Sequence, residues 1–227
     1  MRVRRLAWGA VAGVAVYVAI DVALVFLRPH FSVLHNAESD YGSKGPYDWL
    51  MDLNFLLRAA LSLAAVLALA RFQRPANVPR AGLALLATWA VASGLLAFFP
   101  DDPVGTATHG LARVHLTLAG VAFVAVVVGT RLTTRALRRD PRWRPVIAPL
   151  MLLSWGAIVP VLLLGRAHLR PHSLGGLYEK VFLGLELVWL LAAAAWIAHA
   201  GDAEAVAARQ SFGRRSRSSS GPISNPN

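Results

Sequence analysis

Two segments of the chain concentrate carboxylate, hydroxyl and imidazole side chains, the groups used for acid–base chemistry and for binding Zn²⁺. The first segment spans residues 38–52, beginning with Glu38, and the second spans residues 101–115. Together they predict one candidate polar site, which comprises Ser39, Asp40, Asp52, Asp101, Asp102, His109 and His115. Asp52 and His115 stand out because both are expected inside membrane-spanning helices, where placing a polar side chain costs free energy.

The spacing of these residues does not match a metal-binding motif. The chain has no HExxH sequence, and His109 and His115 are six residues apart, so they do not share a face of one helix. The chain also has no cysteine, which excludes thiolate ligands and disulfides. We therefore assign no cofactor from the sequence, and Zn²⁺ is the ion to test.

Two further charged residues lie inside apolar stretches. Counting about 1.5 Å per residue, Arg58 and Glu186 each lie about 14 Å from the same membrane face, near the bilayer centre. A lone charge there costs roughly 2.5–3.5 kcal/mol, so the two are predicted to form an intramembrane ion pair. The pair either orders helix packing or belongs to a proton or ion path, and Asp21 is the alternative partner of Arg58. Asn54, Arg58 and Ser62 are four residues apart and give their helix one polar face.

The elements that must position these residues are six apolar stretches, each long enough for a helix to cross about 30 Å of hydrocarbon. They lie near residues 6–27, 49–70, 81–99, 111–132, 146–165 and 177–199. The chain has 227 residues, of which 56% are hydrophobic and 15% charged, so no room remains for a large soluble domain. The predicted fold class is all-α, a bundle of six transmembrane helices over residues 1–200.

Arginine alternates between the two sides of these stretches. Arginine clusters lie before the first stretch and after the second, fourth and sixth, whereas the other connections hold most of the acids. By the positive-inside rule both termini are cytoplasmic, and the acid- and His-rich connections are extracytoplasmic. The net charge of +11 is thus explained by topology and anionic lipids, and we expect membrane lipids rather than nucleic acid as partners.

Three local features carry further expectations. Gly9 and Gly13 form a GxxxG pair, expected to allow close approach of two helices within the chain. Pro160 is expected to kink the fifth helix. Residues 201–227 are rich in Arg and Ser and are expected to form a disordered, basic cytoplasmic tail. The oligomeric state is left open.

Several motifs of the chain resemble one family of prokaryotic membrane proteins. The motifs are Ser39–Gly42, Gly45–Met51, Phe99–Pro103 with Gly105, His109 and His115, and two segments of the last helix, Gly176–Lys180 and Leu185–Trp189. The resemblance covers roughly residues 8 to 199 and is to the 998 family of domains of unknown function. It implies a multi-pass helical domain and brings no activity, substrate or cofactor. The family pattern tends to have a single acid where this chain has Asp101 and Asp102, so it does not say which carboxylate matters.

Three functions remain open from the sequence, which does not decide whether the chain is an enzyme. The leading hypothesis is an integral protein of the cytoplasmic membrane whose extracytoplasmic vestibule binds a lipid headgroup or a small polar ligand. The alternative is a metal-assisted hydrolase acting on lipid, with Asp40, Asp101 and His115 as ligands or bases and Ser39 polarising the substrate. A further alternative is a small transporter or channel that uses Arg58 and Glu186.

Overall fold

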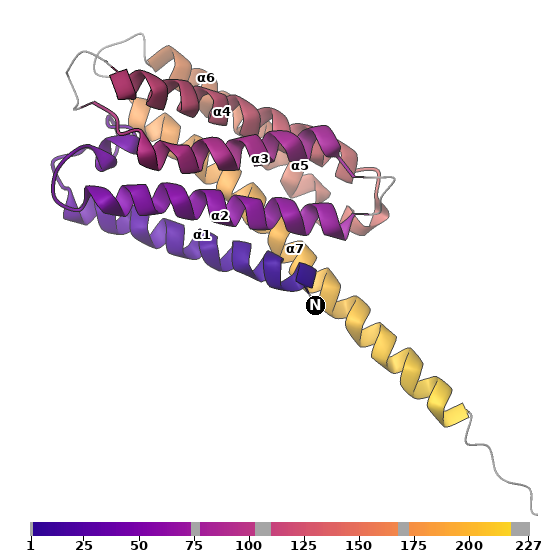
Figure 1. Ribbon diagram of the computed structural model, residues 1–227. Coiled ribbons are helices and arrows are strands. Elements are labelled where there is room, and N and C mark those ends of the chain that lie inside the picture. Colours follow the sequence, from indigo (N-terminus) through magenta and orange to yellow (C-terminus); the bar gives the residue numbers. More distant parts are fainter. Residues whose placement is uncertain (1, 74–77, 103–109, 168–172, 219–227) are drawn as a thin grey trace, which may run out of the picture.

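The computed structural model describes residues 2–73, 78–102, 110–167 and 173–218, with side chains described as far as residue 200. This part of the chain is built from helices (Figure 1). The α-helices are α1 (Arg2–Leu27), α2 (Asp48–Phe72), α3 (Arg80–Leu95), α4 (Gly110–Leu137), α5 (Ile147–Gly156), α6 (Ile158–Ala167) and α7 (Gly175–Ser218). Short 3-10 helices occur at η1 (Ser39–Gly42), η3 (Leu96–Phe98) and η4 (Pro141–Trp143).

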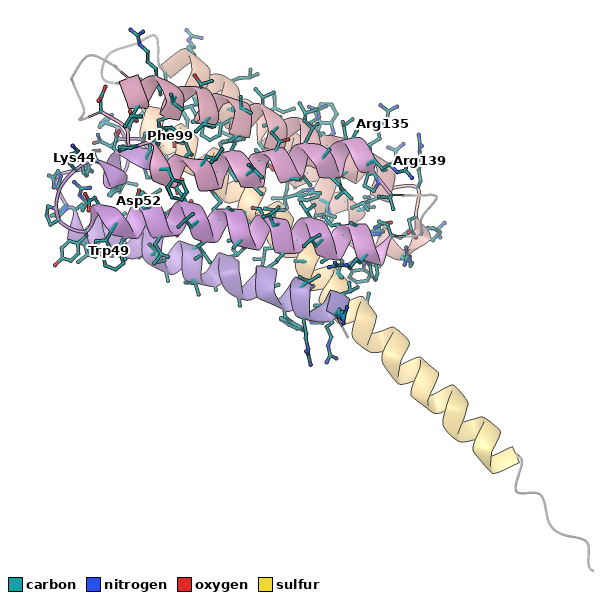
Figure 2. The ribbon with its side chains drawn as sticks, in the orientation of Figure 1. Lys44, Trp49, Asp52, Phe99, Arg135 and Arg139 are labelled. Carbon is teal, nitrogen blue, oxygen red and sulfur yellow. The ribbon has the colours of Figure 1, made fainter. Side chains whose placement is uncertain are left out.

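The α-helices pack into one bundle with two chemically different ends. Six helical segments, with α5 and α6 taken as one, are long and apolar enough to cross a membrane. The all-α fold and the multi-pass architecture predicted from the sequence are therefore confirmed. We call the end where α1 stops and α2 and α7 begin the η1 end, and the opposite end the arginine end. In Figure 2, Lys44, Asp52 and Phe99 lie at the first, and Arg135 and Arg139 lie at the second.

The interior of the bundle is largely apolar, and two of its buried tryptophans donate hydrogen bonds to neighbouring helices. The indole of Trp89 on α3 donates to the Ser62 hydroxyl on α2 at 3.0 Å. The indole of Trp189 on α7 donates to the Thr134 hydroxyl on α4 at 2.9 Å. Because a buried N–H without a partner is costly, these bonds tie each large ring to one neighbouring helix.

The fifth predicted span is interrupted near Ala157, between α5 and α6. Pro160 has no N–H, so the carbonyl of Gly156, four residues earlier, loses its helical donor, and the proline ring also crowds that carbonyl. The helix breaks at this point and resumes at Ile158. The expected distortion by Pro160 is therefore found, as a break into two helices.

The last helix is longer than expected. Disorder was predicted from residue 201, yet α7 continues as helix to Ser218, and residues 219–227 lie outside the described residues. Residues 202–210 are mostly Ala, Glu, Arg and Gln, which favour helix once a helix already leads into them. Figure 1 shows this continuation running past the start of α1 and away from the bundle.

The two glycines of the GxxxG pair differ in their surroundings. A Cβ on Gly13 would lie 2.7 Å from Cβ of Leu61 on α2, whereas a Cβ on Gly9 would have no atom within 4 Å. Gly13 thus allows α1 and α2 of the same chain to pack closely, as expected, and Gly9 does not.

A pair of substitutions tests this difference. Gly13→Ala is expected to lower the free energy of unfolding by about 1 kcal/mol, because Leu61 must shift. Gly9→Ala, on the same helix, is the matched control and should be neutral or slightly stabilising, since alanine is the better helix former. Thermal unfolding of the purified variants in detergent measures both, and an equal loss in the two variants would contradict the assignment.

The long connection between α1 and α2, residues 28–47, folds back onto the bundle. We call it the η1 connection. The guanidinium of Arg28 donates to the carbonyls of Tyr41 and Ser43, at 2.5 and 2.7 Å. The carbonyl of Leu34 accepts the backbone N–H of Leu177, one of the free donors in the first turn of α7, at 3.0 Å. Arg28 therefore closes the connection on itself, and Leu34 fixes it to α7.

Candidate functional site

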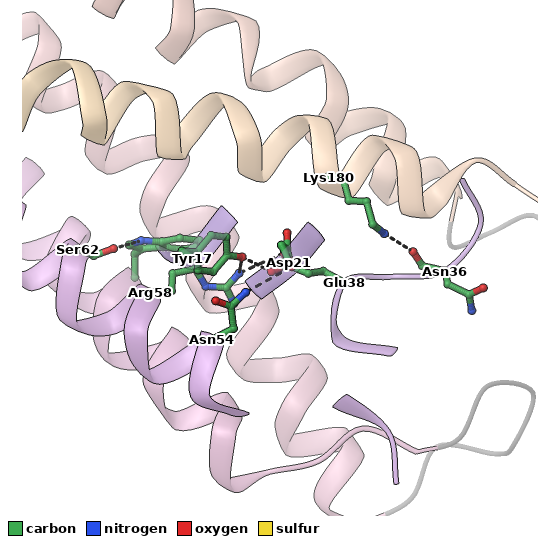
Figure 3. A network of polar contacts seen from close by, with 9 residues as sticks. Tyr17, Asp21, Asn36, Glu38, Asn54, Arg58, Ser62 and Lys180 are labelled. Atoms are coloured by element: carbon green, nitrogen blue, oxygen red, sulfur yellow. Dashed lines mark hydrogen bonds and ion pairs between the residues drawn. The ribbon is translucent and has the colours of Figure 1, made fainter. Parts of the chain in front are cut away.

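The Arg58 side chain, near the middle of α2, carries its charge inside the bundle and is 2% exposed. The η1 connection brings Glu38 against it, and α1 brings Tyr17 (Figure 3). Nη1 of Arg58 donates to the Tyr17 hydroxyl at 3.2 Å and to Oε2 of Glu38 at 3.4 Å. The Tyr17 hydroxyl in turn donates to Oε1 of Glu38. Both carboxylate oxygens of Glu38 are therefore hydrogen-bonded.

Aromatic rings enclose the same guanidinium. Its central carbon lies 5.0 Å from the ring centroid of Phe55, 5.1 Å from that of Trp89 and 5.8 Å from that of Tyr17. Cations are attracted to the faces of aromatic rings, more strongly when water is absent. The Arg58 charge is thus held in place by one carboxylate and three rings. We call this group the Arg58 network; its members are Arg58, Glu38, Tyr17, Phe55 and Trp89.

This arrangement corrects the predicted ion pair of Arg58 with Glu186. Glu186 on α7 is also buried, but the carboxylate that pairs with Arg58 is that of Glu38, at 3.4 Å. The prediction rested on equal depth along two helices, which says nothing about the direction in which each side chain points. It also assumed that partners come from helices, whereas a connection supplies Glu38.

Asp21 lies beside this network without pairing directly to Arg58. Its Oδ1 accepts a hydrogen bond from the Asn54 amide on α2 at 3.4 Å. Asp21 also lines a cavity of about 200 Å³ between α1 and α7, near the η1 end. The cavity is lined by Val18, Asp21, Val22, Val25, Tyr41 and Lys180.

Lys180 is the cation of this cavity, which we call the α1–α7 cavity. Its ammonium donates to the Asn36 carbonyl at 2.7 Å and lies 5.4 Å from the centroid of the Tyr41 ring. An ammonium has three N–H donors, so one such bond leaves capacity for a ligand. One small cavity is therefore lined by the carboxyl group of Asp21, the ammonium group of Lys180 and the exposed valines Val18 and Val22.

The residues of the predicted polar site are only partly brought together. The Ser39 hydroxyl lies 3.5 Å from Oδ2 of Asp101, so the two predicted segments do meet. Asp102 is adjacent, and its backbone N–H donates to Oδ1 of Asp101 at 2.9 Å. Oδ2 of Asp40 accepts from the Asn36 amide and the Ala37 N–H, both at 2.9 Å.

Burial raises the pKa of Asp40 above its ordinary value, and the hydrogen bonds from Asn36 and Ala37 oppose that rise. Asp40 also lines a second cavity of about 190 Å³, together with His35 and Glu179. No Lys or Arg is among the lining residues of this cavity. It therefore offers two carboxylates and an imidazole.

The remaining predicted residues lie apart from this group. His115 is buried, with Nδ1 2.6 Å from the Phe99 carbonyl, and it serves to hold the end of α3 against α4. Asp52 is half-buried on α2, and His109 lies outside the described residues. Among the described residues, no three His, Asp or Glu side chains are grouped so that they could hold a metal ion.

Sequence reasoning missed Tyr17 and Lys180 as members of a site, and it placed Glu38 in the outer polar cluster and not beside Arg58. Tyr17 is the one tyrosine of the first predicted span and lies four residues before Asp21, and this was the available sign of it. Glu38 directly precedes the Ser39–Gly42 motif. Lys180 is one of two lysines in a chain whose other cations are arginines, and the choice of an ammonium inside a span was informative.

Comparison with known proteins places the chain in a family. A family model described as "Protein of unknown function (DUF998)" matches residues 11–196, a range that includes every residue of the Arg58 network and of the α1–α7 cavity. Searches of curated proteins and of solved structures returned no significant match. Because the family model covers most of the chain, the protein belongs to the DUF998 family.

Proposed function

We propose that the protein binds the headgroup of a zwitterionic membrane lipid in the α1–α7 cavity. The observation that carries the proposal is the presence of Asp21 and Lys180 in the walls of one cavity of about 200 Å³. That volume is roughly that of six water molecules in the liquid. It suits a headgroup and excludes a whole lipid.

The chemistry of the walls matches the two charges of phosphatidylethanolamine. The Asp21 carboxylate accepts hydrogen bonds from the primary ammonium, and the Lys180 ammonium donates to the phosphate. Asp21 lies six residues before the end of α1 and Lys180 five residues after the start of α7, so both lie about 8–9 Å inside the helix ends. Val18 and Val22, 46% and 51% exposed, supply an apolar surface for the acyl chains.

The Arg58 network does not line this cavity, and we assign it the role of ordering the helices beside it. Glu38 is fully hydrogen-bonded, and Arg58 is enclosed by rings, which suits an ordering role better than a proton or ion path. Asn54 links α2 to Asp21 and so orients the carboxylate. The described residues give a metal-dependent hydrolase less support, since His115 bonds to a backbone carbonyl away from Asp40.

The location of the site follows from the positive-inside rule. With the arginine end on the cytoplasmic side of a bacterial cytoplasmic membrane, the η1 end faces outward. The α1–α7 cavity is then accessible to lipids of the outer leaflet. Cysteine labelling of single-cysteine variants at Lys44 and at Arg139 from outside intact cells tests this orientation, and we expect labelling at position 44 alone.

Lipid preference tests the proposed function. The purified protein is expected to be stabilised more by phosphatidylethanolamine than by phosphatidylcholine of the same acyl chains, because a quaternary ammonium has no N–H to donate to Asp21. Asp21→Asn should weaken phosphatidylethanolamine binding about tenfold and remove the preference, as a charged hydrogen bond is worth about 1.5–3 kcal/mol. Native mass spectrometry or lipid-dependent thermal shifts measure both.

Asp52→Asn is the matched control, since Asp52 lies near the same end on α2 and does not line the cavity. It should keep the preference. If Asp52→Asn lost the preference and Asp21→Asn kept it, or if the wild type did not distinguish the two lipids, the proposal would be wrong.

A further inference from the structure

A third polar cavity lies at the arginine end of the bundle, between α4 and α5. Its volume is about 490 Å³. It is lined by Arg131, Leu132, Thr134, Arg135, Arg138, Met151, Ser154 and Trp155. None of these residues takes part in the Arg58 network or in the α1–α7 cavity, so the two sites are independent. We call it the arginine pocket.

The charge of the arginine pocket is not compensated. Arg131 and Arg135 are four residues apart on one face of α4, and Arg138 follows directly after the end of that helix, with its N–H still bonded to the Thr134 carbonyl. Among the described residues, none of the three forms an ion pair with a carboxylate. Asp140, the acid that follows α4, is instead bound by Arg142, with 2.7 Å between Nη2 and Oδ2.

The hydroxyl groups of the pocket are already in use. The Thr134 hydroxyl donates to the Thr130 carbonyl at 2.7 Å and accepts from the Trp189 indole. The Ser154 hydroxyl donates to the Met151 carbonyl at 3.1 Å. The groups available to a ligand are therefore the guanidinium N–H donors, which match phosphate oxygens in geometry as well as charge.

One of the three arginines is held in position before any ligand arrives. The central carbon of the Arg131 guanidinium lies 3.5 Å from the centroid of the Trp155 ring on α5. Such stacking restricts the arginine side chain and leaves its N–H edges free to donate. Trp155 thereby links α4 to α5 and forms one wall of the pocket.

We propose that the arginine pocket binds the phosphate of an anionic membrane lipid. A lipid fits better than a soluble anion because the pocket has an apolar rim on the outside of a membrane-spanning bundle. Leu132 and Trp155 are 39% and 57% exposed there. Arg131 lies six residues before the end of α4, about 9 Å inside it, a depth at which arginine side chains extend toward headgroups. Basic pockets between transmembrane helices are suited to anionic headgroups in this way.

The test compares lipids on the full-length protein in detergent micelles. Phosphatidylglycerol is expected to bind more tightly than phosphatidylcholine with the same acyl chains, with an affinity that falls as salt is raised. The triple variant Arg131→Gln/Arg135→Gln/Arg138→Gln should bind phosphatidylglycerol about 100-fold more weakly. Arg139→Gln is the matched control, because it removes a neighbouring charge outside the pocket, and it should change the affinity less than about threefold.

A second variant guards against misfolding of the triple variant. Trp155→Leu keeps all three charges and removes the stacking ring, and we expect it to weaken phosphatidylglycerol binding about fivefold. Equal losses of phosphatidylglycerol affinity in the Arg139 control and the triple variant would overturn the proposal. The net positive charge of the arginine end, and not the pocket, would then explain the binding. The proposal would also be overturned if millimolar inorganic phosphate alone gave the same stabilisation as phosphatidylglycerol, since the ligand would then be a soluble anion.

Discussion

Replacing Arg58 with methionine is expected to lower the free energy of unfolding by about 3–5 kcal/mol, the largest loss of any single substitution discussed for this protein. The reason is that the substitution leaves the buried carboxylate of Glu38 without its cation. Glu38 is buried, and without Arg58 its remaining partner described here is the Tyr17 hydroxyl. Reversible unfolding in mixed micelles measures the loss. Arg139→Met, at an exposed position, should change the unfolding free energy by less than about 0.5 kcal/mol.

A second substitution distinguishes the effect of the Arg58 charge from the effect of its packing contacts. In the Arg58→Met background, Glu38→Gln neutralises the stranded carboxylate and should recover part of the stability. If the double variant were as unstable as the sum of the two single variants, the two residues would not be coupled. The Arg58 side chain would then matter for its contacts with Phe55 and Trp89 instead.

Gly176→Ala is expected to cost about 3 kcal/mol, because the added Cβ would meet backbone rather than a movable side chain. It would lie 2.8 Å from both the carbonyl carbon and the nitrogen of Asn36, and closer still to its carbonyl oxygen. The η1 connection would have to move away from α7. That movement would also separate the Asn36 carbonyl from Lys180.

Gly184 provides the control for this substitution. It lies on the same helix, and a Cβ there would have no atom within 4 Å, so Gly184→Ala should be neutral or slightly stabilising. Thermal unfolding in detergent compares the two variants. A similar loss in both would mean that α7 needs glycine flexibility rather than a close approach at Gly176.

The spans were predictable from the sequence because hydropathy and length are local properties. The stretch predicted near 49–70 is α2, Asp48–Phe72, and the stretch predicted near 81–99 is α3 continued by η3 to Phe98. The polar face of Asn54, Arg58 and Ser62 is buried, since helical periodicity fixes which residues share a face. The orientation of the bundle in the membrane stays a prediction.

The candidate site was harder to predict because it depends on contacts between segments far apart in the chain. The sequence assigned Glu38 to an exterior connection, and nothing in its spacing shows that the connection folds inward. The predicted proximity of Ser39 and Asp101 is found, whereas Arg58 and Glu186 do not pair. Depth can be counted along one helix, but pairing depends on how all the helices are rotated.

The attachment of the η1 connection has a consequence for biogenesis. The carbonyls of Leu34 and Asn36 accept donors from Leu177 and Lys180, which are translated after five of the six spans. During synthesis the ribosome therefore delivers these acceptors long before their donors. The connection reaches its final place only when the last hairpin enters the bilayer, so the earliest and latest parts of the nascent protein complete their assembly in one step.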